Sequence, residues 1–233
     1  MKYQTIIGVI GLGNAGAPIL NNLHKSKKYV LIAYDIDKNK LNDVPDGITK
    51  VSSIKDLAGK CKVVLTCLPK PEHVLHAVDG KDGLLQNASS GMLWIDTSTT
   101  DFKQTQKLAE KAKTYGVSML EATLTGGVHA LQNNNMVCLA GGDKEIFNNW
   151  KEVLQDAIGE VVVLCGDIGA GAIAKVVSNM LAFTNMVAAS ECMMVAKRAG
   201  LDLESFFDAI RVSAGNSFAW ETVVPHIFNQ KYE

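Results

Sequence analysis

The amino-acid pattern predicts an α/β protein: a doubly wound, mostly parallel sheet over residues 1–165, followed by an all-helical part over residues 166–233. Three observations support this prediction. Short apolar runs alternate with amphipathic segments up to about residue 164, a glycine-rich turn follows the first apolar run directly, and the pattern becomes helical after Cys165. Such alternation is typical of parallel strands whose connecting helices cover both faces of a sheet.

The sheet region contains a series of short apolar runs that we interpret as strands. The predicted strands are residues 6–10, 29–35, 61–67, 92–96, 117–121, 136–140 and 161–164. Helical patterns lie between them, such as Asp101–Tyr115 and Lys144–Ala157. Ser53 followed by Asp56 is a signal for the start of a helix.

The helical region opens with a long helix that continues to about Arg198. Leu203–Val212 and Ser217–Val224 have the pattern of shorter helices. Between residues 172 and 195 the long helix is apolar on nearly every side, which is typical of a helix buried between a domain and a partner. We therefore expect a homodimer or homotetramer.

A few polar residues of this helix form one stripe: Lys175, Ser178, Asn179 and Asn185. A lysine amine in a buried helix must be paired, solvated by a cleft or lowered in pKa. Alternatively, Lys175 extends to solvent at the start of the helix. Periodicity alone leaves both interpretations open.

The glycine-rich turn carries the strongest functional signal. Gly11–Leu12–Gly13–Asn14–Ala15–Gly16 follows the apolar run 6–10, and a second apolar run ends at Asp35. In a dinucleotide site Gly11 allows the tight turn, Gly13 lets the backbone approach a pyrophosphate, and Gly16 lets the next helix lie close to the sheet. The order of strand, glycines, helix and acid predicts a dinucleotide site.

Asp35 also bears on the choice of dinucleotide. Its carboxylate is spaced to accept a hydrogen bond from a ribose 2′-hydroxyl and would repel a 2′-phosphate, so NAD is favoured over NADP. The residues that follow contain no arginine, although Lys38 and Lys40 leave NADP possible.

Composition excludes several other classes of protein. The chain has 233 residues, of which 47% are hydrophobic and 20% charged, as in an ordinary globular protein. A net charge of −1 gives no electrostatic footprint for nucleic acid or an acidic membrane. The N-terminus leads straight into a strand, so we expect no targeting peptide and a cytoplasmic location. Asn185 and Glu191 interrupt the longest apolar run, so no membrane span is expected.

Cysteine and histidine spacing gives no sign of a metal site. The five cysteines lack CxxC pairing and fit free thiols in a reducing cytosol. His73 and His76 have no third or fourth ligand near them in the sequence, so we expect no metal.

Taken together, the motifs resemble those of the β-hydroxyacid dehydrogenases, which include 3-hydroxyisobutyrate dehydrogenase, tartronate semialdehyde reductase and, more distantly, 6-phosphogluconate dehydrogenase. The resemblance covers essentially the whole chain and implies a Rossmann-type NAD(P)-binding domain followed by a helical domain. The motifs that carry it are Gly11–Gly16 with Pro18, Thr66–Pro69, Asp96–Thr99, Glu121–Gly127, and Gly169–Gly171 with Lys175 and Asn179.

The resemblance also implies roles for individual residues. The implied reaction is hydride transfer between a nicotinamide and a small 3-hydroxy carboxylate or its semialdehyde, with Lys175 as general acid/base and Asn179 holding substrate oxygens. The implied substrate-binding residues are Ser98, Thr125, Gly126 and Gly127. The implied cofactor-binding residues are Gly11, Leu12, Gly13, Asn14, Ala15, Gly16, Asp35, Leu68, Pro69, His73 and Thr99.

The chain departs from the family pattern at several points. Thr125 stands where serine is usual, Thr123 where proline is usual and Glu121 where aspartate is usual, so we expect the shape of that loop to differ. The sequence stops at Glu233, where family members continue through further helices. We expect weaker substrate binding than in a full-length relative and some exposed apolar surface.

Two other functions are compatible with the motifs. A catalytically silent NAD-binding module used for assembly would keep the glycine-rich turn, but it has no need of Lys175 and Asn179. An imine reductase of the same superfamily is disfavoured, because those enzymes usually replace the catalytic lysine.

Overall fold

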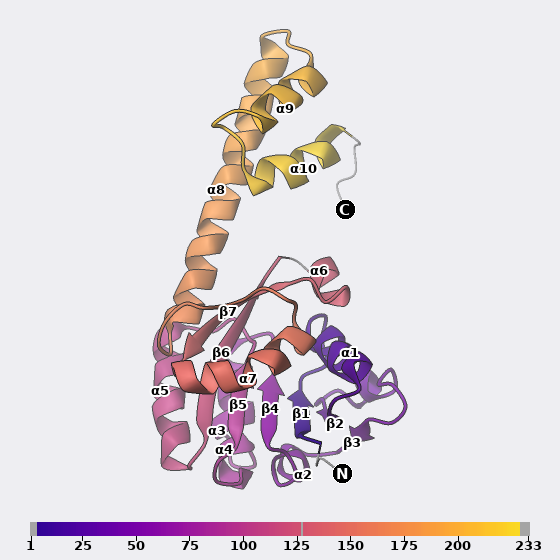
Figure 1. Cartoon of the computed structure of the whole chain (residues 1–233), viewed down its shortest axis with the longest axis vertical. Helices are drawn as coiled ribbons and strands as arrows, with labels where there is room; N and C mark the ends of the chain where they lie inside the picture. The colour runs from indigo at the N-terminus through magenta and orange to yellow at the C-terminus, as the bar shows by residue number, and fades with distance from the viewer. Residues whose placement is uncertain (1–3, 127, 229–233) are drawn as a thin grey trace. The chain divides into compact units, whose positions relative to one another are not determined.

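The computed structural model describes residues 4–126 and 128–228 (Figure 1). The chain divides into two compact units, Met1–Lys175 and Val176–Glu233. This division falls inside one long helix and does not test the domain boundary predicted near residue 165.

The N-terminal unit is built on one sheet. In the described part of the chain it has eight strands in the order β3-β2-β1-β4-β5-β6-β7-β8. Neighbouring strands are parallel except for β6 and β7, which are antiparallel. The strands are β1 Ile6–Ile10, β2 Val30–Tyr34, β3 Thr49–Lys50, β4 Val63–Thr66, β5 Leu93–Asp96, β6 Ser118–Thr125, β7 Val137–Gly142 and β8 Val162–Leu164. The prediction of a doubly wound, mostly parallel sheet is confirmed.

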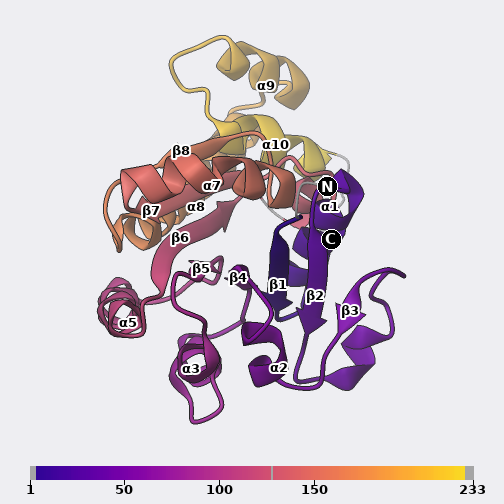
Figure 2. The ribbon, with the colours of Figure 1, turned by 60° about the horizontal axis from the view of Figure 1, so that its bottom comes forward.

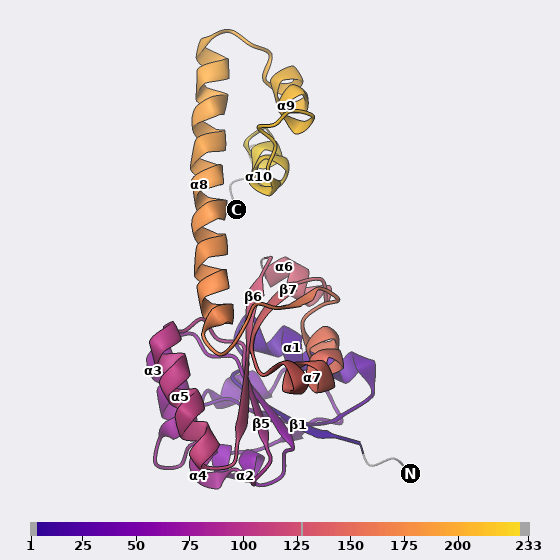
Figure 3. The ribbon, with the colours of Figure 1, turned by 60° about the vertical axis from the view of Figure 1, so that its left-hand side comes forward.

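Helices cover both faces of this sheet, as the edge-on views show (Figures 2 and 3). On one face lie α1 Gly16–Ser26, α6 Val128–Gln132 and α7 Lys144–Ala157. On the other lie α2 Ile54–Ala58, α3 Pro71–Asp79, α4 Leu84–Asn87 and α5 Phe102–Thr114. A short 3-10 helix, η1 Lys38–Leu41, lies between β2 and β3.

Alternate residues of the strands supply the two cores. In β4, Val63 and Leu65 pack with the α1 and α7 side, whereas Val64 packs with the α2–α5 side. Trp94 on β5 is fully buried in the second core. Strands that are buried on both faces must be apolar throughout, which explains why they read as continuous hydrophobic runs.

Strand β6 differs from its prediction. The expected strand was 117–121 with a loop at 125–127, but β6 continues to Thr125. Its additional residues pair with β7, where Thr123 is opposite Leu139 and Thr125 is opposite Val137. The threonines suit a strand once an antiparallel partner is available. The strand 136–140 was predicted, but its antiparallel pairing with this segment was not. The short strand β3 was also not predicted.

The C-terminal unit is helical, as predicted. It contains most of α8 Ala170–Arg198, together with α9 Leu203–Arg211 and α10 Phe218–Phe228. Its small core is centred on Trp220, which meets the ring of Phe206 edge-on at 5.8 Å and stacks on Phe207 at 5.9 Å. Ala189 and Met193 of α8 join the same core.

Helix α8 bears on the expectation that no segment spans a membrane, which stays a prediction. Among the described helices it is the one that is long and apolar enough to cross a membrane by length and composition, with a mean hydropathy of 1.3. Asn185 and Glu191 interrupt the apolar run without lowering this average below the spanning range. Core helices of soluble proteins meet the same criterion but are mostly buried, whereas 11% of the apolar window of α8 is buried.

Candidate active site

The glycine-rich turn connects β1 to α1 at the place where the strand order reverses between β1 and β4. Gly11 has φ +93°, and a Cβ there would overlap the carbonyl oxygen of Cys67. A Cβ at Gly16 would overlap the carbonyl oxygen of Gly11. Both positions therefore require glycine, and the turn lies at the point of an open parallel sheet where ligands bind.

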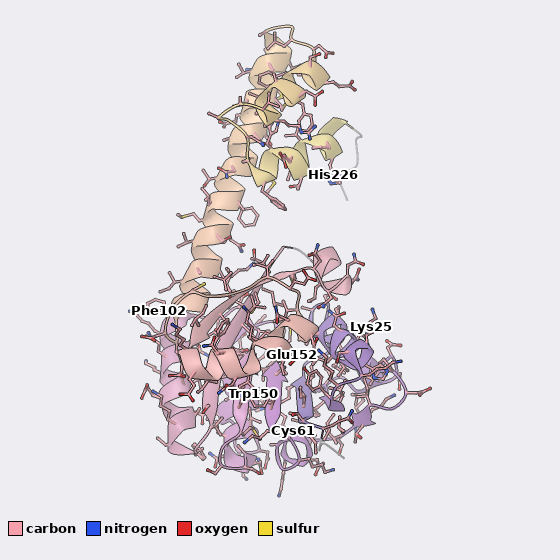
Figure 4. The ribbon with its side chains drawn as sticks, viewed as in Figure 1. Lys25, Cys61, Phe102, Trp150, Glu152 and His226 are labelled. Atoms are coloured by element: carbon pink, nitrogen blue, oxygen red, sulfur yellow. The ribbon has the colours of Figure 1, made fainter. Side chains whose placement is uncertain are left out.

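The start of α1 fits a dinucleotide. Among the described residues no atom lies within 4 Å of the position that a Cβ on Gly13 would take. In that same part of the chain α1 has no side-chain capping hydrogen bond and no acidic residue in its first turn. Its amides and positive helix end are thus available to a diphosphate. An adjacent hollow of about 570 Å³ is lined by Gly13, Asn21 and Lys25, and Lys25 is labelled on α1 in Figure 4.

Asp35 joins the end of β2 to the glycine-rich turn. Its Oδ2 accepts a hydrogen bond from the Leu12 amide at 2.6 Å, and its Oδ1 accepts one from the Asp37 amide at 2.8 Å. The Lys40 ammonium lies 3.6 Å from Oδ2. Asp35 also lines a hollow of about 310 Å³ together with Lys38 and other residues of η1 and β3. The carboxylate is therefore fixed beside a space next to the turn.

The segments after β4 and β5 are tied together. The Leu68 amide donates to Ser98 Oγ at 3.0 Å, which joins a predicted cofactor loop to a predicted substrate residue. Ser98 is only 3% exposed, whereas Thr99 is exposed. Pro69 follows Leu68 before α3 begins.

A buried carboxylate, Asp96, connects these two segments by hydrogen bonds. Its Oδ1 accepts hydrogen bonds from Thr66 Oγ1 at 2.8 Å and from the Ser98 amide at 3.0 Å. The Trp94 indole donates in turn to Thr66 Oγ1 at 2.9 Å. Burial raises the pKa of Asp96 to about 6, although the hydrogen bonds from Ser98 and Thr66 oppose this shift.

Lys175 lies in the second turn of α8, in the N-terminal unit. Its side chain is half-buried, and this burial lowers the pKa of the Lys175 amine. Within residues 4–126 and 128–228 no carboxylate forms an ion pair with it. Asn179 lies one turn further along the same helix, in the C-terminal unit. The structure thus shows an uncompensated, partly desolvated amine on α8.

The remaining predicted site residues have fewer contacts with the glycine-rich turn and the neighbouring loops. Thr125 is the last residue of β6, and Gly126 follows it with φ +126°. Gly127, also predicted to bind substrate, lies outside the described residues. His73 is exposed on α3, and no side-chain hydrogen bond joins it to the turn or loops in the part of the chain that the structure describes. The roles of these residues stay predictions.

Sequence reasoning missed the contribution of Glu121, which it noted only as a departure from a family pattern. Glu121 is 2% exposed, and its carboxylate accepts hydrogen bonds from the amides at the start of α8. Burial raises the pKa of Glu121, and the amides of Gly169, Gly171 and Ala172 oppose this shift. An acidic residue within an otherwise apolar strand is a signal that would have identified it.

Comparison with known proteins agrees with this geometry. A family model described as the NAD binding domain of 6-phosphogluconate dehydrogenase matches residues 6–166, and one described as the NAD-binding of NADP-dependent 3-hydroxyisobutyrate dehydrogenase matches residues 169–233. The chain is 34% identical to human mitochondrial 3-hydroxyisobutyrate dehydrogenase, over 95% of this chain and 66% of that protein. It is 30% identical to the NAD-dependent L-serine dehydrogenase of Pseudomonas aeruginosa, over 94% and 73% respectively.

One solved structure is similar over nearly the whole of this chain. Mycobacterium tuberculosis 3-hydroxyisobutyrate dehydrogenase with L-serine superposes with a TM-score of 0.89 at 29% identity, covering 96% of this chain and 75% of that one. The fold and the glycine-rich turn define an NAD(P)-binding protein of the Rossmann type. More specifically, the chain belongs to the β-hydroxyacid dehydrogenase family. It spans 66% of the length of its human relative.

Proposed function

We propose that this chain catalyses hydride transfer between a nicotinamide dinucleotide and a small 3-hydroxy carboxylate or its semialdehyde, with Lys175 as general acid/base. The observation that carries the proposal is the Lys175 amine, which is half-buried and has no ion-pair partner among the described residues. Its helix starts against β6, next to the carboxyl end of β5 where the Ser98 loop begins. The names of the similar proteins support this substrate class, since 3-hydroxyisobutyrate and L-serine are both 3-hydroxy carboxylates.

We further propose NAD as the preferred cofactor. The glycine-rich turn and the start of α1 would hold the diphosphate, and Asp35 would accept a hydrogen bond from the ribose 2′-hydroxyl. A 2′-phosphate would meet the Asp35 carboxylate instead. Lys38 and Lys40 lie close enough to this region to keep NADP as the alternative, and the model matched by residues 169–233 is described for an NADP-dependent enzyme.

The nicotinamide, when bound, supplies the carbon that takes or gives the hydride. In the oxidative direction the neutral Lys175 amine accepts the hydroxyl proton as the carbinol C–H electron pair leaves and the carbonyl forms. In the reductive direction the protonated amine returns that proton to the carbonyl oxygen. Asn179 would hold substrate oxygens, and Ser98, Thr125, Gly126 and Gly127 would bind the carboxylate.

A lysine variant tests the proposed role. Lys175→Ala is expected to lower kcat by about 10²–10⁴, because proton transfer by a positioned group contributes that much, while dinucleotide affinity changes little. Formation of NADH or NADPH absorbance with 3-hydroxyisobutyrate, L-serine and related acids measures this. Lys197→Ala, in the last turn of the same helix, is the matched control.

The pH dependence gives a second readout of the same experiment. Because the lowered pKa of Lys175 makes the neutral base available at lower pH, oxidation by the wild type should rise with pH along a limb that Lys175→Ala loses. Turnover within tenfold of wild type in Lys175→Ala would contradict the proposed role. Dinucleotide binding with no turnover on any acid would favour the silent assembly module.

A cytoplasmic location and a homo-oligomeric state remain predictions. The human relative is named as a mitochondrial enzyme.

A further inference from the structure

Two neighbouring positions on one face of strand β6 contact the start of the helix that carries Lys175. We propose that Glu121 and Thr123 are positioning residues for Lys175, because together they fix the first turn of α8 against the sheet. This inference rests on the proposed function of Lys175 and goes beyond it by naming the groups that place the amine.

Glu121 provides the first connection. Its Oε2 accepts hydrogen bonds from the amides of Gly169 at 2.5 Å and Gly171 at 3.3 Å, and its Oε1 accepts one from Ala172 at 3.3 Å. These amides would otherwise lack partners at the end of a helix. A carboxylate at this end also interacts favourably with the helix dipole, and hydrogen bonds to a charged group are the stronger kind.

Thr123 provides the second connection. Successive side chains of a strand alternate between faces, so Thr123 points the same way as Glu121. Its hydroxyl lies 2.9 Å from the Leu139 carbonyl on β7 and 3.1 Å from the Gly171 carbonyl on α8. One hydroxyl proton can serve either acceptor. The contact with Gly171 holds the first turn of α8 beside β6, and the contact with Leu139 joins β6 to β7. Thr123 is 2% exposed, so water does not compete for this hydroxyl.

Close packing leaves this first turn little freedom to move. A Cβ at Gly141 of β7 would overlap the Glu121 carboxylate, and a Cβ at Gly171 would lie 2.9 Å from the Leu139 carbonyl oxygen. The helix backbone therefore rests directly on strand β7. Lys175 follows Gly171 by about one helical turn, so the position of that turn sets the position of the amine.

The register of the sheet connects this arrangement to the substrate loop. Asp96 of β5 is the register partner of Glu121 of β6. Asp96 holds the Ser98 amide, as described above, while Glu121 holds the start of α8. Two buried carboxylates on adjacent strands thus relate the loop carrying Ser98 to the helix carrying Lys175. A shift of α8 would change the spacing that hydride and proton transfer require.

Both positioning residues are departures from the family pattern given above. An aspartate at position 121 is shorter by one methylene group, and a proline at position 123 has no hydroxyl to donate. The contacts seen here therefore depend on the residues of this chain.

Three variants of the full chain test the inference: Glu121→Gln, Glu121→Asp and Thr123→Val. We expect Glu121→Gln to lower kcat by about 10- to 100-fold with dinucleotide Kd within about twofold of wild type, because misplacing a catalytic group by about 1 Å has effects of this size. Glu121→Asp keeps the charge and should recover part of the loss. Thr123→Val should lower kcat less and change KM little. Amide hydrogen exchange over residues 167–175 should be faster in Glu121→Gln and Thr123→Val.

The matched control is Asp143→Asn. Asp143 caps a different helix, α7, by accepting hydrogen bonds from the amides of Glu145 and Ile146. Its variant loses a capping charge without touching α8, so kcat should be unchanged.

The outcomes distinguish the positioning role of Glu121 and Thr123 from the proposed function of Lys175. Folded Glu121→Gln and Thr123→Val proteins with wild-type kcat would overturn the positioning role and leave the proposed function intact. If Glu121→Gln does not fold, Glu121→Asp and Thr123→Val decide. If the wild type shows no turnover, the proposed function fails, and unchanged exchange over residues 167–175 in the variants would then also overturn the contact with α8.

Discussion

Burial shifts the pKa values of the ionisable residues around the candidate site in opposite directions. It lowers the pKa of Lys175 and raises those of Asp96 and Glu121, because an environment of low dielectric disfavours the charged form of each. For Lys175 the shift favours a neutral base. For the two carboxylates the rise in pKa is opposed by hydrogen bonds that they accept, from Ser98 and Thr66 at Asp96 and from backbone amides at Glu121.

Asp96 should make the stability of the protein depend on pH. Its folded-state pKa is about 6, against an ordinary value of 3.8, so the native state retains a proton that the unfolded state has lost between these values. The stabilisation is fully present below pH 3.8 and is lost as pH rises through 6. As pH rises through this range, the wild type should lose on the order of 3 kcal/mol of unfolding free energy because of Asp96. The Asp96→Asn variant should lack this pH-dependent loss.

Urea denaturation of wild type and Asp96→Asn between pH 4 and pH 7.5 measures this difference. The exposed Asp46→Asn variant serves as control. A gap between wild type and Asp96→Asn that stays constant across this pH range would show that Asp96 does not titrate as described.

In the glycine-rich turn, different glycines allow close packing and leave room for a ligand. Gly11 and Gly16 face backbone atoms that leave no room for a side chain, whereas Gly13 faces open space. The first two therefore serve the fold, and the third leaves room for the ligand.

A pair of variants separates these two roles. Gly16→Ala would force a Cβ onto the Gly11 carbonyl, so we expect a loss of about 2–4 kcal/mol in stability together with loss of dinucleotide binding. Gly13→Ala should fold with nearly wild-type stability and still lose binding, because its methyl group occupies the diphosphate position. Thermal unfolding and NADH fluorescence titration measure the two effects. If the Gly13→Ala variant binds the dinucleotide tightly, the diphosphate does not lie against Gly13.

Strand β6 shows the limit of local patterns at this level. The run ending at Glu121 predicted a strand, but its continuation to Thr125 depends on antiparallel pairing with β7, the next strand along the chain. Helix α7, in contrast, was predicted with its observed bounds from its helical pattern alone. The structure shows in addition that Asp143 caps it by accepting hydrogen bonds from its first amides.

For the whole molecule, the apolar surface of α8 is the feature that bears on assembly. In the C-terminal unit the helix exposes a series of apolar side chains: Val176, Val177, Met180, Leu181, Phe183, Val187, Met194 and Val195. Stable monomers rarely expose so many together. This surface supports the prediction of a homodimer or homotetramer.

Sedimentation equilibrium tests that prediction. The wild type should associate at micromolar concentration, and Phe183→Glu should shift the equilibrium toward monomer by at least tenfold, since a charge in an apolar interface is costly to bury. Val212→Glu is the control, because Val212 is an isolated apolar residue that is 90% exposed. A wild-type monomer at micromolar concentration would contradict the prediction.

Sequence alone was enough to predict the strands of the sheet apart from β3, the glycine-rich turn and the acid at Asp35, because each depends on periodicity or on fixed spacing along the chain. It also singled out Lys175 from a polar stripe on an apolar helix. Three-dimensional packing was needed to show that Asp96 and Glu121 are register partners and that Glu121 and Thr123 hold the start of α8. The contacts of Glu121 and Thr123 with the start of α8 join residues 48 positions apart. The pairing of Asp96 with Glu121 depends on sheet register, which no local pattern specifies.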